Sequence, residues 1–193
     1  MSYLEISELK ALGFNSLGRN VLISRKASIY NPSKISIGDH ARIDDFCILS
    51  AGEGGITIGK YVHIACYCCL QGNACIMLHD FSGLSSRVAI YSSTDDFSGE
   101  AMPHPTIPEK FRKIISKPVV LNKHVLVGTG STILPGVNLG EGVAVGAMSL
   151  VDKNCDSFCI YIGIPAKKLK ERKRNLLRLE KELLTEENQN RTI

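Results

Sequence analysis

Between residues 79 and 95 the chain carries an imidazole and carboxylates, side chains that can take up or give a proton. His79 is followed directly by Asp80, and Asp95 stands four residues after Tyr91. An imidazole is a common general base, whereas an aspartate with an ordinary pKa of about 3.9 is a weak one unless burial raises that pKa. These residues favour a reaction in which a nucleophile must be oriented and must lose a proton.

Two runs of small residues and three lysines form a second candidate site. The runs are Gly128-Thr-Gly-Ser131 and Gly146-Ala-Met-Ser149, and they leave backbone amides and carbonyls within reach of an extended ligand. Lys153, Lys167 and Lys168 could neutralise phosphates as point charges. The alternative interpretation of these lysines is a solvated terminus.

The elements that must position these residues repeat every six positions. Each hexad has an aliphatic residue at position one, often glycine at position two, and a small residue or valine at position five, a rule that only Glu53 breaks. Inward-pointing aliphatic side chains at this spacing would stack into one continuous core. The hexads begin at Leu17, Ile23, Ile29, Ile37, Ile43, Leu49, Ile58, Ile64, Leu70, Leu78, Leu84, Ile90, Leu121, Val127, Ile133, Leu139, Val145 and Val151.

The hexads are grouped in threes, with triplets starting at 17, 37, 58, 78, 121 and 139. One triplet is one turn of a coil: three short strands are joined by tight corners, and each pairs in parallel with its counterpart about 4.8 Å away in the next coil. The pattern therefore predicts an all-β parallel β-helix of about six coils. Its handedness does not follow from the spacing, because the general rule for parallel crossovers would favour a right-handed turn.

This pattern resembles the hexapeptide-repeat acyltransferases over residues 17–165. Residues 127–140 and 145–151 are similar to the last full coils of that family, and Gly163-Ile-Pro-Ala-Lys167 is similar to its exit motif. The resemblance implies a left-handed parallel β-helix of triangular cross-section. It also implies acetyl-CoA as co-substrate, no metal, and a homotrimer whose active sites lie between subunits.

Within that family, residues 88–100 look most like acetyltransferases acting on sugars and nucleotide-linked aminosugars of bacterial surface polysaccharides. The base of the family, often a histidine, follows a Tyr-x-x-x element, and here that place is Asp95. A carboxylate can orient an amine that attacks in its free form, whereas a sugar hydroxyl needs a stronger base. The resemblance thus implies an N-acetyltransferase of a nucleotide-linked amino-dideoxyhexose, of the dTDP-4-amino-4,6-dideoxyglucose type, for O-antigen or capsule synthesis.

The same resemblance assigns roles to individual residues. The expected catalytic residues are Asp95 and His79, the latter with Asp80 as its orienting acid. The residues expected to bind the acceptor substrate are Tyr91, Asp96, His104 and His124. The residues expected to bind acetyl-CoA are Gly128, Ser131, Ala147, Lys153, Lys167 and Lys168.

Several alternatives stay open. His79 occupies a corner position that is mostly glycine in the other coils, and His124 occupies an outward corner position shared with His40, so both also have structural interpretations. An O-acetyltransferase of a galactoside or surface glycan would use the same fold. A non-enzymatic prism is disfavoured by the long loop. A β-helical zinc carbonic anhydrase needs three histidines that converge on one metal ion, and His40, His63 and His79 fall at different hexad positions and do not stack.

Three segments lie outside the repeat. Residues 1–16 are expected to cap the first coil, with a short helix over 5–12 that ends before Gly13. Residues 96–118 interrupt the coils as a long loop, which in a regular solenoid is usually functional. Residues 166–193 are expected to form a C-terminal tail with an amphipathic helix over 167–187, packing on a neighbour.

Composition excludes several other classes. The net charge of +4 comes from the C-terminal tail, which lacks the aromatic residues of a nucleic-acid footprint. The seven cysteines are an odd number without a cluster at zinc-ligand spacing, and they are expected to be small buried hydrophobes. Apolar runs are far shorter than the roughly 20 residues of a membrane span, and the first residues do not resemble a secretory signal. We expect no membrane insertion and a cytoplasmic location.

Overall fold

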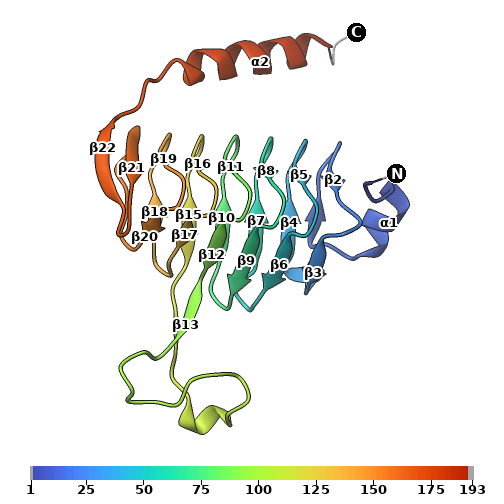
Figure 1. The fold of residues 1–193 in the computed structure, drawn as a ribbon. Coiled ribbons are helices and arrows are strands. Elements are labelled where there is room, and N and C mark those ends of the chain that lie inside the picture. Colours follow the sequence, from blue (N-terminus) through green and yellow to red (C-terminus); the bar gives the residue numbers. More distant parts are fainter. Residues whose placement is uncertain (1, 191–193) are drawn as a thin grey trace.

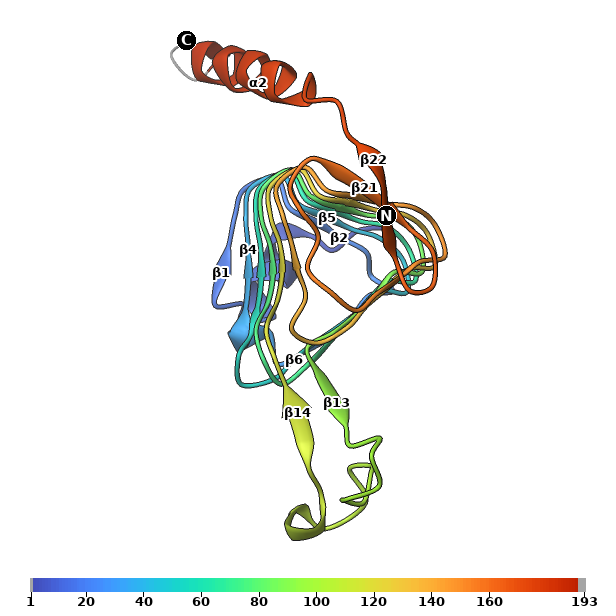
Figure 2. The same ribbon diagram turned by 90° about the vertical axis from the view of Figure 1, so that its left-hand side faces the viewer.

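A triangular prism of stacked β coils dominates the computed structural model, which describes residues 2–190 (Figures 1 and 2). The first sheet contains β1 (Ser16–Leu17), β4 (Ile35–Ile37), β7 (Ile56–Ile58), β10 (Ile76–Leu78), β15 (Val119–Leu121) and β18 (Asn138–Leu139). The second contains β2 (Leu22–Ile23), β5 (Arg42–Ile43), β8 (His63–Ile64), β11 (Gly83–Leu84), β16 (Leu126–Val127), β19 (Ala144–Val145), β21 (Cys159–Ile162) and β22 (Lys167–Glu171). The third contains β3 (Ser28–Tyr30), β6 (Ile48–Ala51), β9 (Cys69–Gly72), β12 (Ala89–Tyr91), β17 (Thr132–Ile133) and β20 (Leu150–Val151).

The register of these sheets follows the hexads. Leu84 pairs in parallel with Ile64 on one side and Val127 on the other, so the position-one residues stack along the prism. All position-one residues are buried except Leu17 and Ile29 of the first coil, which are half-buried. The predicted parallel β-solenoid is therefore confirmed. It has about seven turns, because β21 adds a parallel strand beyond the last triplet.

One corner of the prism carries a column of stacked rings. His40, Tyr61, Phe81 and His124, called the aromatic ladder below, follow successive strands of the first sheet with ring centroids 4.7 to 5.2 Å apart. Each of these residues has a φ of 56 to 62°, because the chain turns sharply here in the left-handed region. The turn points each side chain outward.

The inserted loop leaves the prism as a β-hairpin. β13 (Ser93–Asp95) pairs antiparallel with β14 (Ile114–Ser116), and the short 3₁₀ helix η2 (Glu109–Phe111) lies near the tip. The insertion thus begins before residue 96. The hairpin emerges where the third sheet passes to the first and projects away from the second sheet (Figures 1 and 2).

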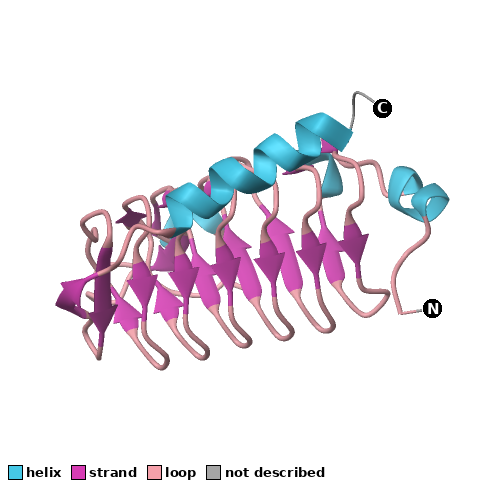
Figure 3. Ribbon diagram, turned by 90° about the horizontal axis from the view of Figure 1, so that it is seen from above, coloured by secondary structure: helices cyan, strands magenta, loops and turns pink. Residues whose placement is uncertain are grey.

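The two ends of the chain cover different parts of the prism. α1 (Ile6–Ala11) buries Leu9 against the first coil, as predicted for a cap, and the 3₁₀ helix η1 (Pro32–Lys34) fills a corner. α2 (Leu176–Asn190) runs along the prism axis (Figure 3). The predicted start of this helix at Lys167 is wrong: residues 167–171 form β22, which pairs with β21 and satisfies the backbone groups of that strand. Within residues 2–190, no helix is both long and apolar enough to span a membrane.

Candidate active site

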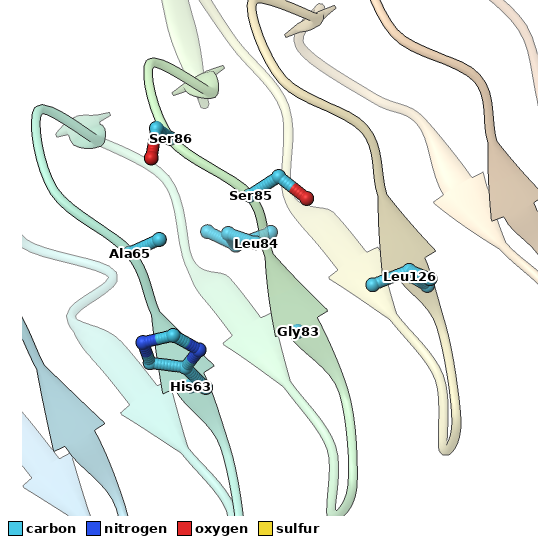
Figure 4. A pocket seen from close by; sticks show the side chains of 7 residues that line it. All are labelled: His63, Ala65, Gly83, Leu84, Ser85, Ser86 and Leu126. Atoms are coloured by element: carbon cyan, nitrogen blue, oxygen red, sulfur yellow. The ribbon is translucent and has the colours of Figure 1, made fainter.

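A shallow groove of about 300 Å³ lies on the outer face of the second sheet. It is lined by His63, Ala65, Gly83, Leu84, Ser85, Ser86 and Leu126 (Figure 4). The groove is open because Gly83 has no side chain between two larger neighbours in the ladder, His63 and Leu126. A Cβ on Gly83 would still lie 3.6 Å from Leu126 Cδ1, so the backbone there leaves room for a ligand.

Small residues continue the groove towards the C-terminal coils. Ser85 is followed in the next coils by Gly128 and Gly146, and Ala147 is exposed beside them. A Cβ on Gly128 would lie 2.5 Å from Ala147 N, so the glycine is also required by the packing of the coils. This row includes Gly128 and Ala147, for which binding of an extended amide chain stays a prediction.

Ser131 does not belong to that face. Its side chain is fully buried, its hydroxyl donates to Gly146 O at 2.9 Å, and it accepts a hydrogen bond from Ser149 N at 3.1 Å. The prediction that Ser131 contacts a cofactor is therefore wrong, because position five points into a corner of the coil, where the hydroxyl satisfies backbone groups.

The three predicted lysines are exposed, but only two of them lie together. Lys167 and Lys168 are adjacent on β22, opposite Ile162 and Tyr161. Contact with the Cys159 thiol raises the pKa of Lys168. Lys153 lies beyond the far end of β20, so it does not join the other two in one cationic cluster.

The hairpin brings Asp95 and His104 together. Asp95 Oδ2 lies 4.0 Å from His104 Nδ1, and the side chain of Asp95 is 34% exposed. Asp95 ends β13 and pairs with Ile114, so its backbone is held by the hairpin while its carboxylate stays accessible. The predicted base and one predicted substrate-binding residue therefore share a surface.

Asp96 and Tyr91 have more local roles. The Asp96 carboxylate accepts hydrogen bonds from the Ser98 hydroxyl at 2.8 Å and from Ala101 N at 3.0 Å, and the Ser98 contact lowers the pKa of Asp96. It fixes the loop instead of presenting a free carboxylate to a substrate. Tyr91 is 36% exposed, and its partial burial raises the pKa of the hydroxyl.

The predicted His79–Asp80 pair is not formed. The Asp80 carboxylate accepts a hydrogen bond from Lys60 N at 2.7 Å, and in the described part of the chain no hydrogen bond links it to His79. Asp80 thus stabilises the corner of the preceding coil. His124 is not accessible to a substrate in this chain, because α2 covers it and its Nε2 lies 2.7 Å from Glu180 Oε2.

A histidine–aspartate pair at the N-terminal end of the groove was not predicted from the sequence. His63 Nε2 lies 2.8 Å from Asp44 Oδ2, and Asp44 also accepts a hydrogen bond from Arg42 Nε at 2.7 Å. Burial alone would raise the pKa of Asp44, but the hydrogen bonds from His63 and Arg42 outweigh it and lower that pKa. The hexad register could have predicted this proximity, because it makes Arg42 and His63 neighbours in the second sheet.

One chain does not bring all these groups together. Asp95 lies on the hairpin, which leaves the prism opposite the second sheet, whereas the groove lies on the outer face of that sheet. In residues 2–190 no cluster of three or more His, Cys, Asp and Glu side chains is placed to hold a metal ion. The chemistry available is that of a carboxylate, an imidazole, hydroxyls and backbone amides.

Comparisons with known proteins connect these features to an activity, although no family model matches the chain. The chain is 49% identical, over 93% of its length and 94% of the relative, to a dTDP-4-amino-4,6-dideoxy-D-glucose acyltransferase of Escherichia coli. It is 51% identical to AntD, an N-acyltransferase from Bacillus cereus solved with dTDP and 3-hydroxybutyryl-CoA, with 97% and 98% of the two chains covered and a TM-score of 0.93.

Further structures of AntD contain coenzyme A with dTDP-4-amino-4,6-dideoxyglucose, at 50% identity, a TM-score of 0.92, and coverage of 96% and 98% of the two chains. A hexapeptide-repeat acetyltransferase from Vibrio cholerae, 21% identical with a TM-score of 0.60 over 89% and 83% of the two chains, shares the fold. The predicted family is thus confirmed by relatives that match nearly the whole chain. This chain belongs to the hexapeptide-repeat acyltransferases and is an acyltransferase.

Proposed function

We propose that the enzyme transfers an acyl group from a coenzyme A thioester to the 4-amino group of a dTDP-linked 4-amino-4,6-dideoxyhexose, for the synthesis of a surface polysaccharide. The observation that carries the proposal is the accessible Asp95 carboxylate on the hairpin, 4.0 Å from His104, in place of the family's usual histidine. The E. coli relative and AntD, whose names and ligands fit the same acceptor, support it.

The chemistry fits these side chains. The amine nitrogen attacks the thioester carbonyl, the C–N bond forms, the C–S bond breaks, and the nitrogen loses a proton as the coenzyme A thiol is released. Asp95 orients the N–H group and accepts the proton, which then passes to the departing thiolate, so that the thiol is released and the carboxylate is restored. The Ser85 hydroxyl, which lines the groove, donates to the reacting thioester. Solved variants of AntD in which one aspartate or one serine is replaced fit a site built from these two residue types.

The site is completed by a second subunit in a homotrimer. Asp95 and the groove lie on different sides of one chain, so a neighbouring chain must supply one of them. Exposed apolar side chains on this part of the prism support such contacts: Phe46 and Tyr67 stack at 5.0 Å and are 46% and 52% exposed, and Leu126 is 46% exposed. The seven free thiols fit a reducing compartment, the cytoplasm.

Free thiol release from acetyl-CoA tests the activity. The 4-amino sugar nucleotide should be a substrate, and its 4-hydroxyl counterpart should not. Preference for the hydroxyl compound would establish the O-acetyltransferase alternative instead. Parallel assays with 3-hydroxybutyryl-CoA, the thioester bound in one AntD structure, decide whether acetyl is the preferred group.

Subunit mixing tests the shared site. Asp95→Asn removes the carboxylate, and Gly83→Phe fills the groove, where a Cβ has room. Each variant alone should keep at most about a hundredth of the wild-type activity and should be trimeric by light scattering. A random one-to-one mixture should recover about a quarter of the wild-type activity, because about one interface in four then combines an intact Asp95 with an intact groove. No recovery in verified mixed trimers, or a monomeric mass near 21.1 kDa, would refute this arrangement.

A further inference from the structure

Arg42 and His63 are fixed side by side at the N-terminal end of the groove. Asp44 contacts His63 Nε2 at 2.8 Å with one carboxylate oxygen and Arg42 Nε at 2.7 Å with the other. The side chains of Arg42 and His63 are each 51% exposed, whereas Asp44 is 18% exposed. Asp44 therefore holds two accessible donors in place through its two carboxylate oxygens.

The contacts with Asp44 use only one nitrogen of Arg42 and one of His63. Arg42 uses Nε on Asp44, and among residues 2–190 its two terminal NH₂ groups make no hydrogen bond of normal distance and angle. The guanidinium also lies 5.7 Å from the centre of the Tyr3 ring. His63 uses Nε2 on Asp44 and keeps Nδ1. An imidazole that lines a groove and a guanidinium next to it, both restrained, suit a phosphate, because little side-chain freedom is lost on binding.

The direction of the groove assigns this end to the acceptor. Its C-terminal part is built from small residues, Gly128, Gly146 and Ala147, which suit the narrow pantetheine arm of the cofactor. Lys167 and Lys168 lie on β22 at that same end of the second sheet. An acceptor that meets the thioester near Ser85 must then extend the other way, over His63 and Arg42.

We propose that Arg42 and His63 form the subsite for the diphosphate of the nucleotide-sugar acceptor, with Asp44 as the residue that positions both. This inference rests on the proposed function, which supplies the nucleotide diphosphate. Arg42 and His63 donate to the diphosphate at one end of the groove, and Lys167 and Lys168 hold the cofactor phosphates at the other.

Calorimetric titration of dTDP tests the subsite with Arg42→Gln and His63→Gln. Each variant should bind dTDP about tenfold more weakly or worse, as expected for a lost hydrogen bond to a charged group, with coenzyme A affinity unchanged. Arg19→Gln is the matched control: Arg19 makes a similar surface pair with Asp39 at 3.1 Å but follows β1 of the first sheet, whereas Arg42 pairs in register with the groove residue His63. Its dTDP affinity should equal that of the wild type.

Steady-state kinetics separates this inference from the proposed function. Both variants should raise KM for the sugar nucleotide and leave KM for acyl-CoA and kcat nearly unchanged. If the wild type binds dTDP but both variants bind it equally well, the subsite is refuted while the proposed function stands. If the wild type itself neither binds dTDP nor acylates the sugar, the proposed function fails. Should Arg42→Gln fold poorly, Arg42→Lys and His63→Asn give the same comparison.

Discussion

Glu180 of α2 accepts a hydrogen bond from His124 of the aromatic ladder at 2.7 Å, and the two side chains are only 9% and 8% exposed. Lys123 contacts the other oxygen of the same carboxylate. Leu179 and Leu183 on the same helix are 50% and 39% exposed, so apolar burial does not explain why α2 lies where it does. Charged contacts with the corner hold the helix on its own chain, and these two leucines stay exposed.

Glu180→Gln should loosen α2. Loss of the charge weakens two charge-assisted hydrogen bonds and should cost about 1–2 kcal/mol of docking free energy. Far-UV circular dichroism at 222 nm measures the helix directly, and the variant should lose helical signal on mild heating before the β signal changes. Glu182→Gln, which breaks an exposed pair with Arg178, is the control and should have little effect. Identical melting of the two variants would contradict the assignment.

The same contact predicts acid sensitivity. Burial alone would raise the pKa of Glu180, but hydrogen bonds from Lys123 and His124 outweigh it and hold that pKa below its ordinary value of 4.5. The undocked carboxyl therefore takes up its proton at a higher pH than the docked one, so docking is complete above pH 4.5 and weakens as the pH falls further. The helical signal of the wild type should fall in that range, and the Glu180→Gln variant should lack this step.

Asp95→Asn should lower kcat/KM for the amine substrate by roughly 10² or more, because the amide keeps the shape of the side chain but cannot take a proton. His79→Gln should matter far less, since His79 makes no pair with Asp80 in the described residues. His79 also lies after the C-terminal end of β10, whereas the hairpin joins the N-terminal end of the neighbouring strand β15. Initial rates of the two variants measured across pH decide whether Asp95 or His79 is the base. A larger loss in His79→Gln would move the base to the imidazole.

Lys168→Ala should raise KM for acyl-CoA about fivefold with little change in kcat, because an exposed lysine contributes modestly to holding a phosphate. Lys153→Ala should have a smaller effect, since Lys153 lies beyond β20 and away from β22. A dephospho-coenzyme A thioester distinguishes the phosphates: the wild type should discriminate against it, and Lys168→Ala should not. Equal discrimination by both proteins would exclude Lys168 from the 3′-phosphate site.

The six-residue period predicted the core because it determines which side chains point into the coil and stack on one another. Ile64 is buried between Ile43 and Leu84 since each stands at position one of its hexad, so periodicity alone identifies the contact. Asp95 and His104 could be assigned to one inserted loop for a similar reason, because the interruption of the period is visible. Their 4.0 Å separation depends on the pairing of β13 and β14, which has no periodic signal.

Contacts between the tail and the prism could not be predicted in this way. His124 and Glu180 are separated by 56 residues, and the hydrogen bond between them depends on the path of the chain through β22. That strand has an amphipathic sequence compatible with a helix, and pairing with β21 decides its conformation. Ser131 was misassigned because small residues suit both an exposed groove and a crowded corner, and only the buried hydrogen bonds to Gly146 and Ser149 distinguish them.

Thiol reactivity gives a final prediction for the interior of the coils. Burial raises the pKa of Cys155 to about 12, and contact with the Cys47 thiol together with burial also raises the pKa of Cys68. Because only thiolates alkylate readily, neither should react with iodoacetamide at pH 8 in the native enzyme, and both should react in urea. Peptide mass spectrometry measures each site, with the half-buried Cys66 and Cys75 as internal comparators. Native labelling of Cys155 as fast as in urea would show that the last coils open readily and that this cysteine does not serve as packing.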